Sequence, residues 1–422
     1  MRHLLITTTF LLCFQISGVN AAEAEKILIQ NATVITAVDS QILENTDLLI
    51  DSGLIVGIGN DLVADDAITI DASNQIITPG LIAPHSQLGL VEIQLERETR
   101  DDSTEYFSAG FSIVDAFNPS STLIPYNRSG GITSAIVIPS SSDTIYSGMA
   151  SVFKLDGELA ADSIAKDIAM AVSFGAGSDS RASQILLLED SFDKALRFND
   201  SRELILQGGY FDYDDYTIRD LEAILRVLNK EIPLIVRSNR AKDLLRMISI
   251  GNKYGIKIVF HGAKEAWRIA EIIAEAGIPV ILDPMDNLPS SFDAIAARMD
   301  NAYLLNKAGV KILITSQDTH NSYLSRQGAG NAVAHGLPQY EAIKALTANV
   351  AEVFGLSDEL GTIEVGKVAD LVIWDGNPLE VSSFATAVFI DGKQVSLVSR
   401  STRLRDRYLQ KLGLTKQPLI EN

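Results

Sequence analysis

The sequence predicts an α/β protein, a TIM (β/α)8 barrel joined to a small composite β-sandwich domain built from both chain ends. Two observations predict this. Short β-rich runs separated by Gly, Asn and Asp occur near both ends of the chain. Between them, over residues 79–356, apolar runs alternate with stretches in which Leu, Ile and Ala recur at helical spacing. The length of 422 residues suits one large barrel with an appendage.

Residues 1–21 predict a cleavable secretory signal, because a basic start and an apolar stretch precede the small residues of Val19-Asn20-Ala21. The alternative is a membrane anchor, but the stretch is shorter than the roughly 20 residues a spanning helix needs and contains several threonines. Cys13, the only cysteine, lies inside it. We therefore expect a periplasmic or secreted protein whose mature chain has no disulfide and no thiolate metal site.

After the signal, residues 22–78 contain three β-rich runs with turn residues between them, and residues 357–400 return to the same pattern. We expect these two segments to form one β-domain. Residues 401–422 are charged and predict a surface helix followed by a tail. The stretch from Glu92 to Asp102 is acidic, and we expect it to be a solvated segment after the first barrel strand.

Strands of the barrel are predicted where apolar runs recur every 20 to 35 residues, at 232–239, 256–262, 278–284 and 310–318, with an earlier run at 132–139. The intervening residues have helical periodicity, as in the βα repeat of a parallel sheet. A doubly wound open sheet is the alternative architecture.

The chain has 35 Lys and Arg against 54 Asp and Glu, a net charge of −19. Nucleic acid is excluded as an expected partner, because its binding depends on Lys and Arg neutralising phosphates. No stretch after the signal is long and apolar enough to predict a membrane span.

Active sites of parallel barrels gather at the carboxyl ends of the strands, so polar residues that close apolar runs are candidate site residues. His85, His261 and Asp318 each close such a run. Each could instead be structural, as a hydrogen-bonded histidine or a helix cap. Together they could bind a divalent metal and activate its water. His320 is a further pocket candidate, whereas His335 lies in a helical pattern and is expected to pack.

Four segments resemble the amidohydrolase superfamily, and most closely its secreted imidazolonepropionase-like and dihydroorotase-like members. The resemblance covers about residues 27–398. It implies a metal-dependent barrel with a composite β-domain that hydrolyses C–N bonds in cyclic or linear amides or small peptides. The segments are ITPGLIAPHSQLGL (77–90), FHGAKEAWRIAEIIAEAGIPVIL (260–282), GAGNAVAHGLPQYEAIKALTANVAEVFGL (328–356) and LGTIEVGKVADLVIWDGNPLE (360–380).

The sequence departs from the pattern of this family at the metal ligands. The first strand of the family usually ends in His-x-His, and here Gln87 takes the second position. Where relatives have histidines on the fifth strand, this chain has Arg237 and Asn239, and residues 175–177 read Gly-Ala-Gly where relatives have Gly-Glu-Asn. His85, His261 and Asp318 could still hold one zinc or other divalent ion, with Gln87 as a neutral donor. Two metals are not supported.

Three functions remain open. The first is a mononuclear hydrolase in which Asp318 also moves the proton and Arg237 binds a substrate carboxylate. The second is a metal-free homologue that acts as a binding or partner subunit, with Arg237 supplying the positive charge. The third is a solute-binding role in which a pocket with Arg237 and Asn239 holds an anionic ligand. His320 is a further candidate for substrate binding. A homo-oligomer and a complex with an intact paralogue are both compatible with the sequence.

Overall fold

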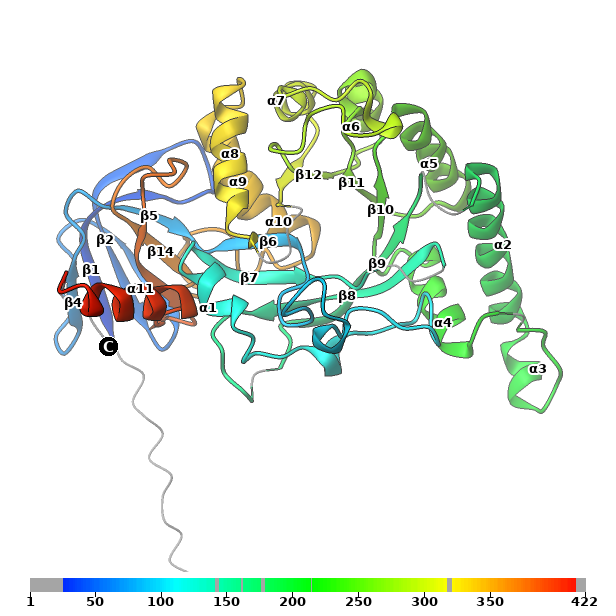
Figure 1. Ribbon diagram of the computed structural model, residues 1–422, viewed down its shortest axis with the longest axis horizontal. Helices are drawn as coiled ribbons and strands as arrows, with labels where there is room; N and C mark the ends of the chain where they lie inside the picture. Colours follow the sequence, from blue (N-terminus) through cyan, green and yellow to red (C-terminus); the bar gives the residue numbers. More distant parts are fainter. Residues whose placement is uncertain are drawn as a thin grey trace, which may run out of the picture.

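The computed structural model describes residues 26–140, 144–160, 162–175, 179–213, 215–316 and 321–414. The predicted signal and the predicted site residues Asp318 and His320 lie outside the described residues. Two eight-stranded sheets lie side by side, one at the left of Figure 1 and one forming the barrel at its centre and right. The predicted fold class, a barrel with a separate sheet from both chain ends, is confirmed.

The sheet of the β-domain has the strand order β16-β15-β14-β5-β1-β2-β3, with β4 paired to β1. β14 runs antiparallel to β5, so the two chain ends share one sheet. Trp374 on β14 is fully buried, and its indole N–H donates to Thr78 Oγ1 at 3.0 Å. The strands are β1 (Ile27–Ile35), β2 (Ile42–Asp51), β3 (Leu54–Gly59), β4 (Ile68–Asp71), β5 (Ile76–Pro79), β14 (Leu371–Trp374), β15 (Ala385–Ile390) and β16 (Lys393–Gln394).

The barrel sheet follows chain order from β6 to β13, and the two end strands meet where Thr315 Oγ1 donates to the carbonyl of His85 at 3.2 Å. All neighbouring strands are parallel except that β8 is antiparallel to both β7 and β9. The strands are β6 (Leu81–Ser86), β7 (Ile132–Val137), β8 (Tyr146–Lys154), β9 (Ala165–Ser173), β10 (Leu234–Ser238), β11 (Ile258–Gly262), β12 (Val280–Leu282) and β13 (Ile312–Ile314).

The sequence did not predict β8 and β9. Their buried positions include Gly148, Ala150, Ala169 and Ala171, so neither strand has the continuous run of large apolar residues that marks β10 to β13. Gly148 has a φ of +125°, and a Cβ there would lie 2.6 Å from the carbonyl oxygen of Phe111. Only glycine fits this approach between strand and loop.

Helices cover the outside of the barrel, and local signals mark their ends. Thr217 and Asp220 form a capping box at the start of α4. Gly255, with a φ of +67°, ends α5 in the left-handed conformation. The helices are α1 (Leu123–Arg128), α2 (Arg181–Asp200), α3 (Arg202–Leu206), α4 (Ile218–Leu228), α5 (Ala241–Tyr254), α6 (Ala270–Glu275), α7 (Asn301–Lys307), α8 (Leu324–Ala334), α9 (Gln339–Leu346), α10 (Ala348–Val353) and α11 (Arg400–Lys411).

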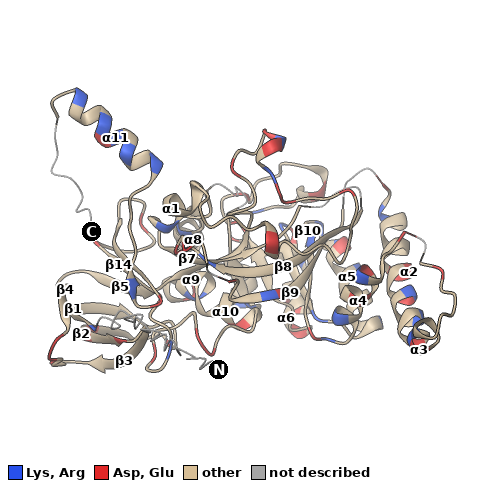
Figure 2. Cartoon of the chain, turned by 90° about the horizontal axis from the view of Figure 1, so that it is seen from below, with Lys and Arg blue, Asp and Glu red and all other residues tan. Residues whose placement is uncertain are grey.

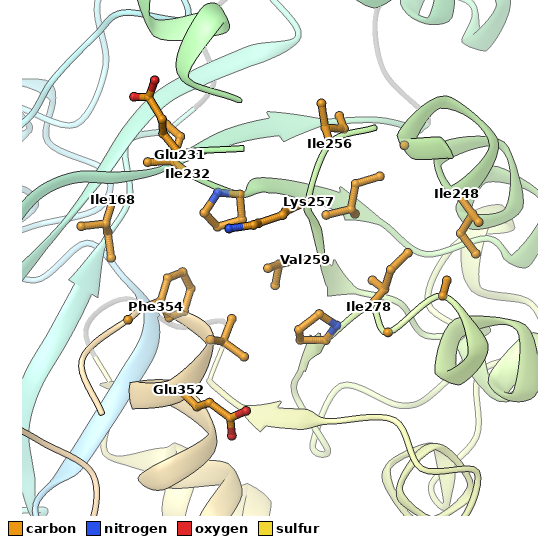
Figure 3. A pocket seen from close by; sticks show the side chains of 18 of the residues that line it. Ile168, Glu231, Ile232, Ile248, Ile256, Lys257, Val259, Ile278, Glu352 and Phe354 are labelled. Carbon is orange, nitrogen blue, oxygen red and sulfur yellow. The ribbon is translucent and has the colours of Figure 1, made fainter. Parts of the chain in front are cut away.

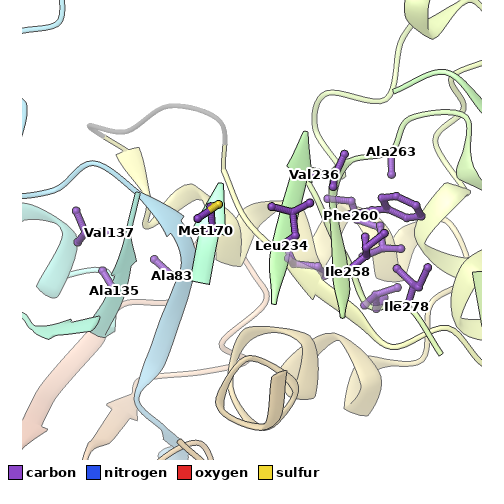
Figure 4. Packing of buried hydrophobic residues seen from close by; sticks show 14 of the residues in the cluster. Ala83, Ala135, Val137, Met170, Leu234, Val236, Ile258, Phe260, Ala263 and Ile278 are labelled. Atoms are coloured by element: carbon purple, nitrogen blue, oxygen red, sulfur yellow. The ribbon is translucent and has the colours of Figure 1, made fainter. Parts of the chain in front are cut away.

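Alternation along the strands divides the apolar residues between two layers. Leu234, Val236, Ile258 and Phe260 belong to the cluster between strands and outer helices, and Figure 4 shows them packed side by side. The alternate residues fill the interior of the barrel, where Phe354 after α10 also packs. The inner layer consists of Ile82, Ile136, Ala150, Val152, Ala169, Ala171, Ile235, Val259, Ile281 and Leu313.

Lys154 on β8 connects the barrel to the β-domain. Its ammonium group pairs with Asp391 and lies 3.7 Å from Asp370 Oδ1. Asp370 also accepts a hydrogen bond from the backbone N–H of Asp391. Burial raises the pKa of Asp370 to about 6, although Lys154 and the N–H of Asp391 act in the opposite direction.

The raised pKa of Asp370 predicts a pH-dependent stability. Between about pH 4 and 6 the folded chain binds this proton more tightly than the unfolded chain, so stability falls as the pH rises through that window. We expect Asp370→Asn to remove this loss. Between pH 4.5 and pH 7.5 the free energy of unfolding should fall by about 2 kcal/mol more in wild type than in the variant. Urea unfolding at both pH values measures it. Asp358→Asn, at an exposed carboxyl group, is the control and should keep the wild-type difference; equal behaviour of the two variants would contradict the prediction.

Candidate active site at the carboxyl end of the barrel

The inner faces of the barrel strands change from apolar to polar at their carboxyl ends. Two residues beyond the inner-layer residues Ile235 and Val259, the same strand faces present Arg237 and His261. These two residues are direct partners in the β10–β11 register. The polar layer at this end also contains Ser173, Asp283 and Thr315, which follow Ala171, Ile281 and Leu313 in the same way.

His85 joins this layer from β6. The pairing of β6 with β7 shifts register between Ala83 and Ser86, and a bulge of this kind redirects a side chain. The His85 and His261 rings lie stacked, with centroids 4.2 Å apart and planes at 29°. The prediction that these two histidines share a pocket therefore agrees with their geometry.

Each histidine has one buried ring nitrogen without a hydrogen-bond partner among the described residues. These atoms are Nδ1 of His85 and Nε2 of His261. Burial lowers the pKa of His85 to about 4, and the charge of Arg237 adds to this. Burial, His85 and Arg237 together lower the pKa of His261 well below its usual value. Both imidazoles are therefore neutral at pH 7, with lone pairs available to an electrophile or a proton.

Arg237 is the charged residue that acts on both histidines, because its positive charge contributes to the lowered pKa of each. Its side chain is exposed and forms no ion pair with an acidic residue of the described chain. An unpaired guanidinium beside neutral imidazoles is a suitable binding group for a substrate carboxylate.

Gln87 is held by a network that the sequence did not predict. Its amide nitrogen donates to Asp102 Oδ2 at 2.9 Å and contacts Ser140. Asp102 is completely buried, accepts from Ser140, and receives two hydrogen bonds from Arg100 at 3.1 and 2.9 Å. The expectation that Glu92–Asp102 is a solvated segment is therefore wrong at its end, because Asp102 anchors the loop beside the site.

The remaining residues singled out from the sequence are Asn239, His335, Asp318 and His320, and none of them is seen hydrogen-bonded to the histidine pair among the described residues. Asn239 follows β10, and its Oδ1 is buried without a partner among the described residues. Gly262 has a φ of +86°, and a Cβ there would lie 2.6 Å from that oxygen. His335 follows α8, and its Nδ1 lies 2.8 Å from the carbonyl oxygen of Asn331. This contact is within its own helix end, so His335 is not part of the histidine pair. Asp318 and His320 lie outside the described residues.

Sequence reasoning missed Asp102, Ser140, Asp283 and Thr315. Asp283 and Thr315 could have been found, because each lies two residues beyond an inner-layer position on a predicted strand. Asp102 and Ser140 lie in loops after β6 and β7, where no periodic pattern indicates burial. Asp283 Oδ1 accepts the N–H of Met285, so part of its hydrogen-bonding capacity is used within its own loop.

Comparison with known proteins agrees with this barrel. Residues 225–398 match the model of the amidohydrolase family. An amidohydrolase of known structure from Thermotoga maritima MSB8 is 28% identical and superposes with a TM-score of 0.79 over 88% of this chain and 99% of that one. The family match and this superposition together support the amidohydrolase superfamily for this chain. Structures that are less similar in sequence, such as a prolidase complexed with N-methylphosphonate-L-proline at 16% identity and a TM-score of 0.55, share the fold.

Curated members of the superfamily are also similar in sequence. Amidohydrolase tasK from Hapsidospora irregularis is 26% identical over 386 residues, 82% of this chain but only 39% of that protein. A 5-methylthioadenosine/S-adenosylhomocysteine deaminase from Thermoanaerobacter pseudethanolicus is 25% identical over 83% of this chain and 85% of its own. The chain thus spans about two fifths of tasK and most of the deaminase.

Members of the superfamily generally use a divalent metal, and the residues present fit one ion at most. The two orphaned imidazole nitrogens are suitable ligands. Among the described residues, however, no three His, Cys, Asp or Glu side chains are placed to hold a metal. Asp318, the third ligand expected from the sequence, lies outside the described residues. The adjacent positive charge of Arg237 opposes the binding of any cation at this position.

A separate cavity of about 680 Å³ opens at the opposite end of the barrel. Figure 3 shows Ile232, Ile256 and Ile278, which precede β10, β11 and β12, with Lys257 and Glu352 beside them. Glu352 pairs with Lys311. In barrels of this kind, the amino ends of the strands serve stability and the carboxyl ends serve chemistry. We therefore place the candidate site at His85 and His261.

Proposed function

We propose that the protein hydrolyses a C–N bond in a small cyclic or linear amide, or in a short peptide that carries a free carboxylate. The observation that carries this proposal is the pair of stacked, neutral histidines at the carboxyl end of the barrel, each with a buried ring nitrogen that has no partner among the described residues. The match to the amidohydrolase family supports hydrolysis, and Arg237, which forms no ion pair with a described acidic residue, supports a carboxylate on the substrate.

His85, His261 and Asp318 are the residues that would hold one divalent ion, zinc by preference for imidazole and carboxylate ligands. Bound there, the ion supplies a water molecule of lowered pKa. Arg237 binds the substrate carboxylate and orients the scissile amide toward the histidines. Asp318, which follows β13 in the sequence, accepts the proton of the attacking water and transfers it to the leaving nitrogen.

The test combines metal analysis with a substrate screen. Protein purified without chelator is analysed for metal content and incubated with dipeptides, hydantoins and lactams. We expect close to one equivalent of metal per chain and hydrolysis in at least one substrate class. Less than about a tenth of an equivalent, with no gain of metal or activity on reconstitution with zinc, overturns the proposal.

Arg237 also favours a second candidate function. Its guanidinium could replace the metal charge, and the protein would then be a metal-free binding or partner subunit. The same analysis separates the two candidates, because the binding subunit has no metal and does not hydrolyse any of the amides but retains affinity for carboxylates.

Substitution of Arg237 is expected to affect substrates selectively. We expect Arg237→Ala to raise KM for a carboxylate-bearing substrate roughly 10- to 100-fold, because a charge-assisted hydrogen bond contributes about 1.5–3 kcal/mol. The amidated form of the same substrate should show a change of less than about threefold. Steady-state kinetics with both forms measure this. Lys242→Ala, on the exposed face of α5, is the control; an equal loss for both substrate forms would refute carboxylate binding by Arg237.

A further inference from the structure

Helix α11 lies on the surface of the molecule, and α1 is the helix that it contacts. Figure 2 shows it projecting from the body, directed away from β3, with Lys and Arg along its length. Residues 400–411 contain five basic side chains and one acidic side chain, Asp406, within a chain of net charge −19. No residue of α11 is buried.

One face of α11 carries exposed apolar side chains. Leu404, Tyr408 and the following Leu412 lie four residues apart, which places them in one row along the helix. Their side chains are 37%, 55% and 70% exposed. Arg403 and Arg407, beside this row, form no ion pair with a described residue. Leu404 and the two arginines line a groove against residues 120–125, whereas Tyr408 and Leu412 do not. The outer part of this apolar row, flanked by cations, is therefore a surface without a partner in the described chain.

The first part of the β-domain has the complementary character. Residues 27–79 contain eight acidic residues and neither Lys nor Arg. The loop between β3 and β4 presents Asp61, Asp65 and Asp66, which make no ion pair within the described chain. Val63 in this loop is 86% exposed, and Ile68 at the start of β4 is 47% exposed. We name residues 60–68 the acidic edge.

We propose that α11 of one copy docks on the acidic edge of a second copy. The charges are complementary, and exposed apolar side chains occur on both surfaces. Each copy has one helix and one acidic edge, so a two-fold arrangement uses both pairs and closes. A polyanionic partner such as an anionic membrane is disfavoured, because the body of the protein is strongly acidic. Docking is expected to weaken with salt.

The first experiment measures self-association of the full-length protein by sedimentation equilibrium at 50 and 500 mM NaCl. We expect a dimer at micromolar concentration in low salt, with at least about tenfold weaker association in high salt. Arg403→Glu/Arg407→Glu/Lys411→Glu should be monomeric under both conditions. A monomeric wild type, or a triple variant that dimerises as wild type does, overturns the proposal.

The acidic edge is reversed in a second variant, Asp61→Asn/Asp65→Lys/Asp66→Asn. Asn is used at positions 61 and 66 because their φ values are +56° and +66°, which Asn tolerates. This variant should also be monomeric. An equimolar mixture of the helix variant and the edge variant should form a heterodimer, because each reversed surface meets an oppositely charged one. Absence of this heterodimer, with both variants folded by circular dichroism, overturns the assignment of the surfaces.

A matched control separates local docking from net charge. Lys166→Glu/Lys242→Glu/Lys257→Glu, at exposed lysines of the barrel, changes the net charge by the same amount as the helix variant Arg403→Glu/Arg407→Glu/Lys411→Glu. It should dimerise as wild type does. If this control is also monomeric, general repulsion explains the effect and the proposal fails. Wild-type binding to vesicles that contain phosphatidylglycerol, without self-association, would likewise overturn it in favour of a lipid surface.

Discussion

His261→Ala is expected to lose bound metal and to reduce hydrolysis by at least about 100-fold. Substitution of residues that merely orient metal ligands costs 10- to 100-fold, so removal of a direct ligand should cost no less. His261 is one of only two described histidines in the layer, and its buried Nε2 has no hydrogen-bond partner in the part of the chain that the structure describes. A catalytic zinc site needs three protein ligands, and without His261 only His85 and Asp318 would remain.

Metal content and kcat/KM are measured together, since a loss of activity alone could reflect misfolding. His335→Ala is the matched control, because His335 bonds to a backbone carbonyl of α8 and not to the site. The control should retain metal and activity. Full metal content in His261→Ala would contradict the assignment of this residue as a ligand.

Asp102→Ala is expected to destabilise the fold by about 3 kcal/mol. The Asp102 carboxylate is completely buried and accepts hydrogen bonds from Gln87, Arg100 and Ser140. Burial alone would raise its pKa, but the hydrogen bonds from Arg100 and Ser140 outweigh burial and lower it. Removing one partner of such a network leaves the others unsatisfied, which costs 3–5 kcal/mol in buried pairs. We take the lower value because Arg100 is about a third exposed.

Urea unfolding monitored by two probes measures this loss. Asp101→Ala is the control, because the neighbouring carboxyl group is exposed and its removal should change stability by less than about 0.5 kcal/mol. The lowered pKa also means that the stabilisation by Asp102 is present above the unfolded pKa and is lost as the pH falls through the folded pKa. A loss of the same size in Asp101→Ala would contradict this account.

Much of the fold could be predicted because its signals are local. Apolar runs identified β10 to β13, and turn-rich β patterns identified both parts of the β-domain. β8 escaped prediction because small residues interrupt its apolar character, and its antiparallel direction depends on pairing with β7 and β9. Strand direction is a property of the sheet and has no signature within nine residues of sequence.

The candidate site was predictable in part for the same reason. His85 and His261 close apolar runs, and a barrel brings strand ends together, so their common location followed from the sequence. Their ring stacking did not, because it depends on a register shift in β6. The burial of Asp102 was hidden because, besides its near neighbour Arg100, its donors are Gln87, fifteen residues away, and Ser140, thirty-eight residues away.

The sequence by itself determined the barrel, the composite β-domain and the shortage of metal ligands, because these depend on periodicity and on which residue types are present. The tertiary structure decided which side chains act together. It placed Arg237 beside two neutral histidines and buried Asp102 under Gln87. It also left every residue of α11 outside the core. Charge, burial and hydrogen bonding are set by neighbours in space, and in this chain those neighbours are distant in sequence.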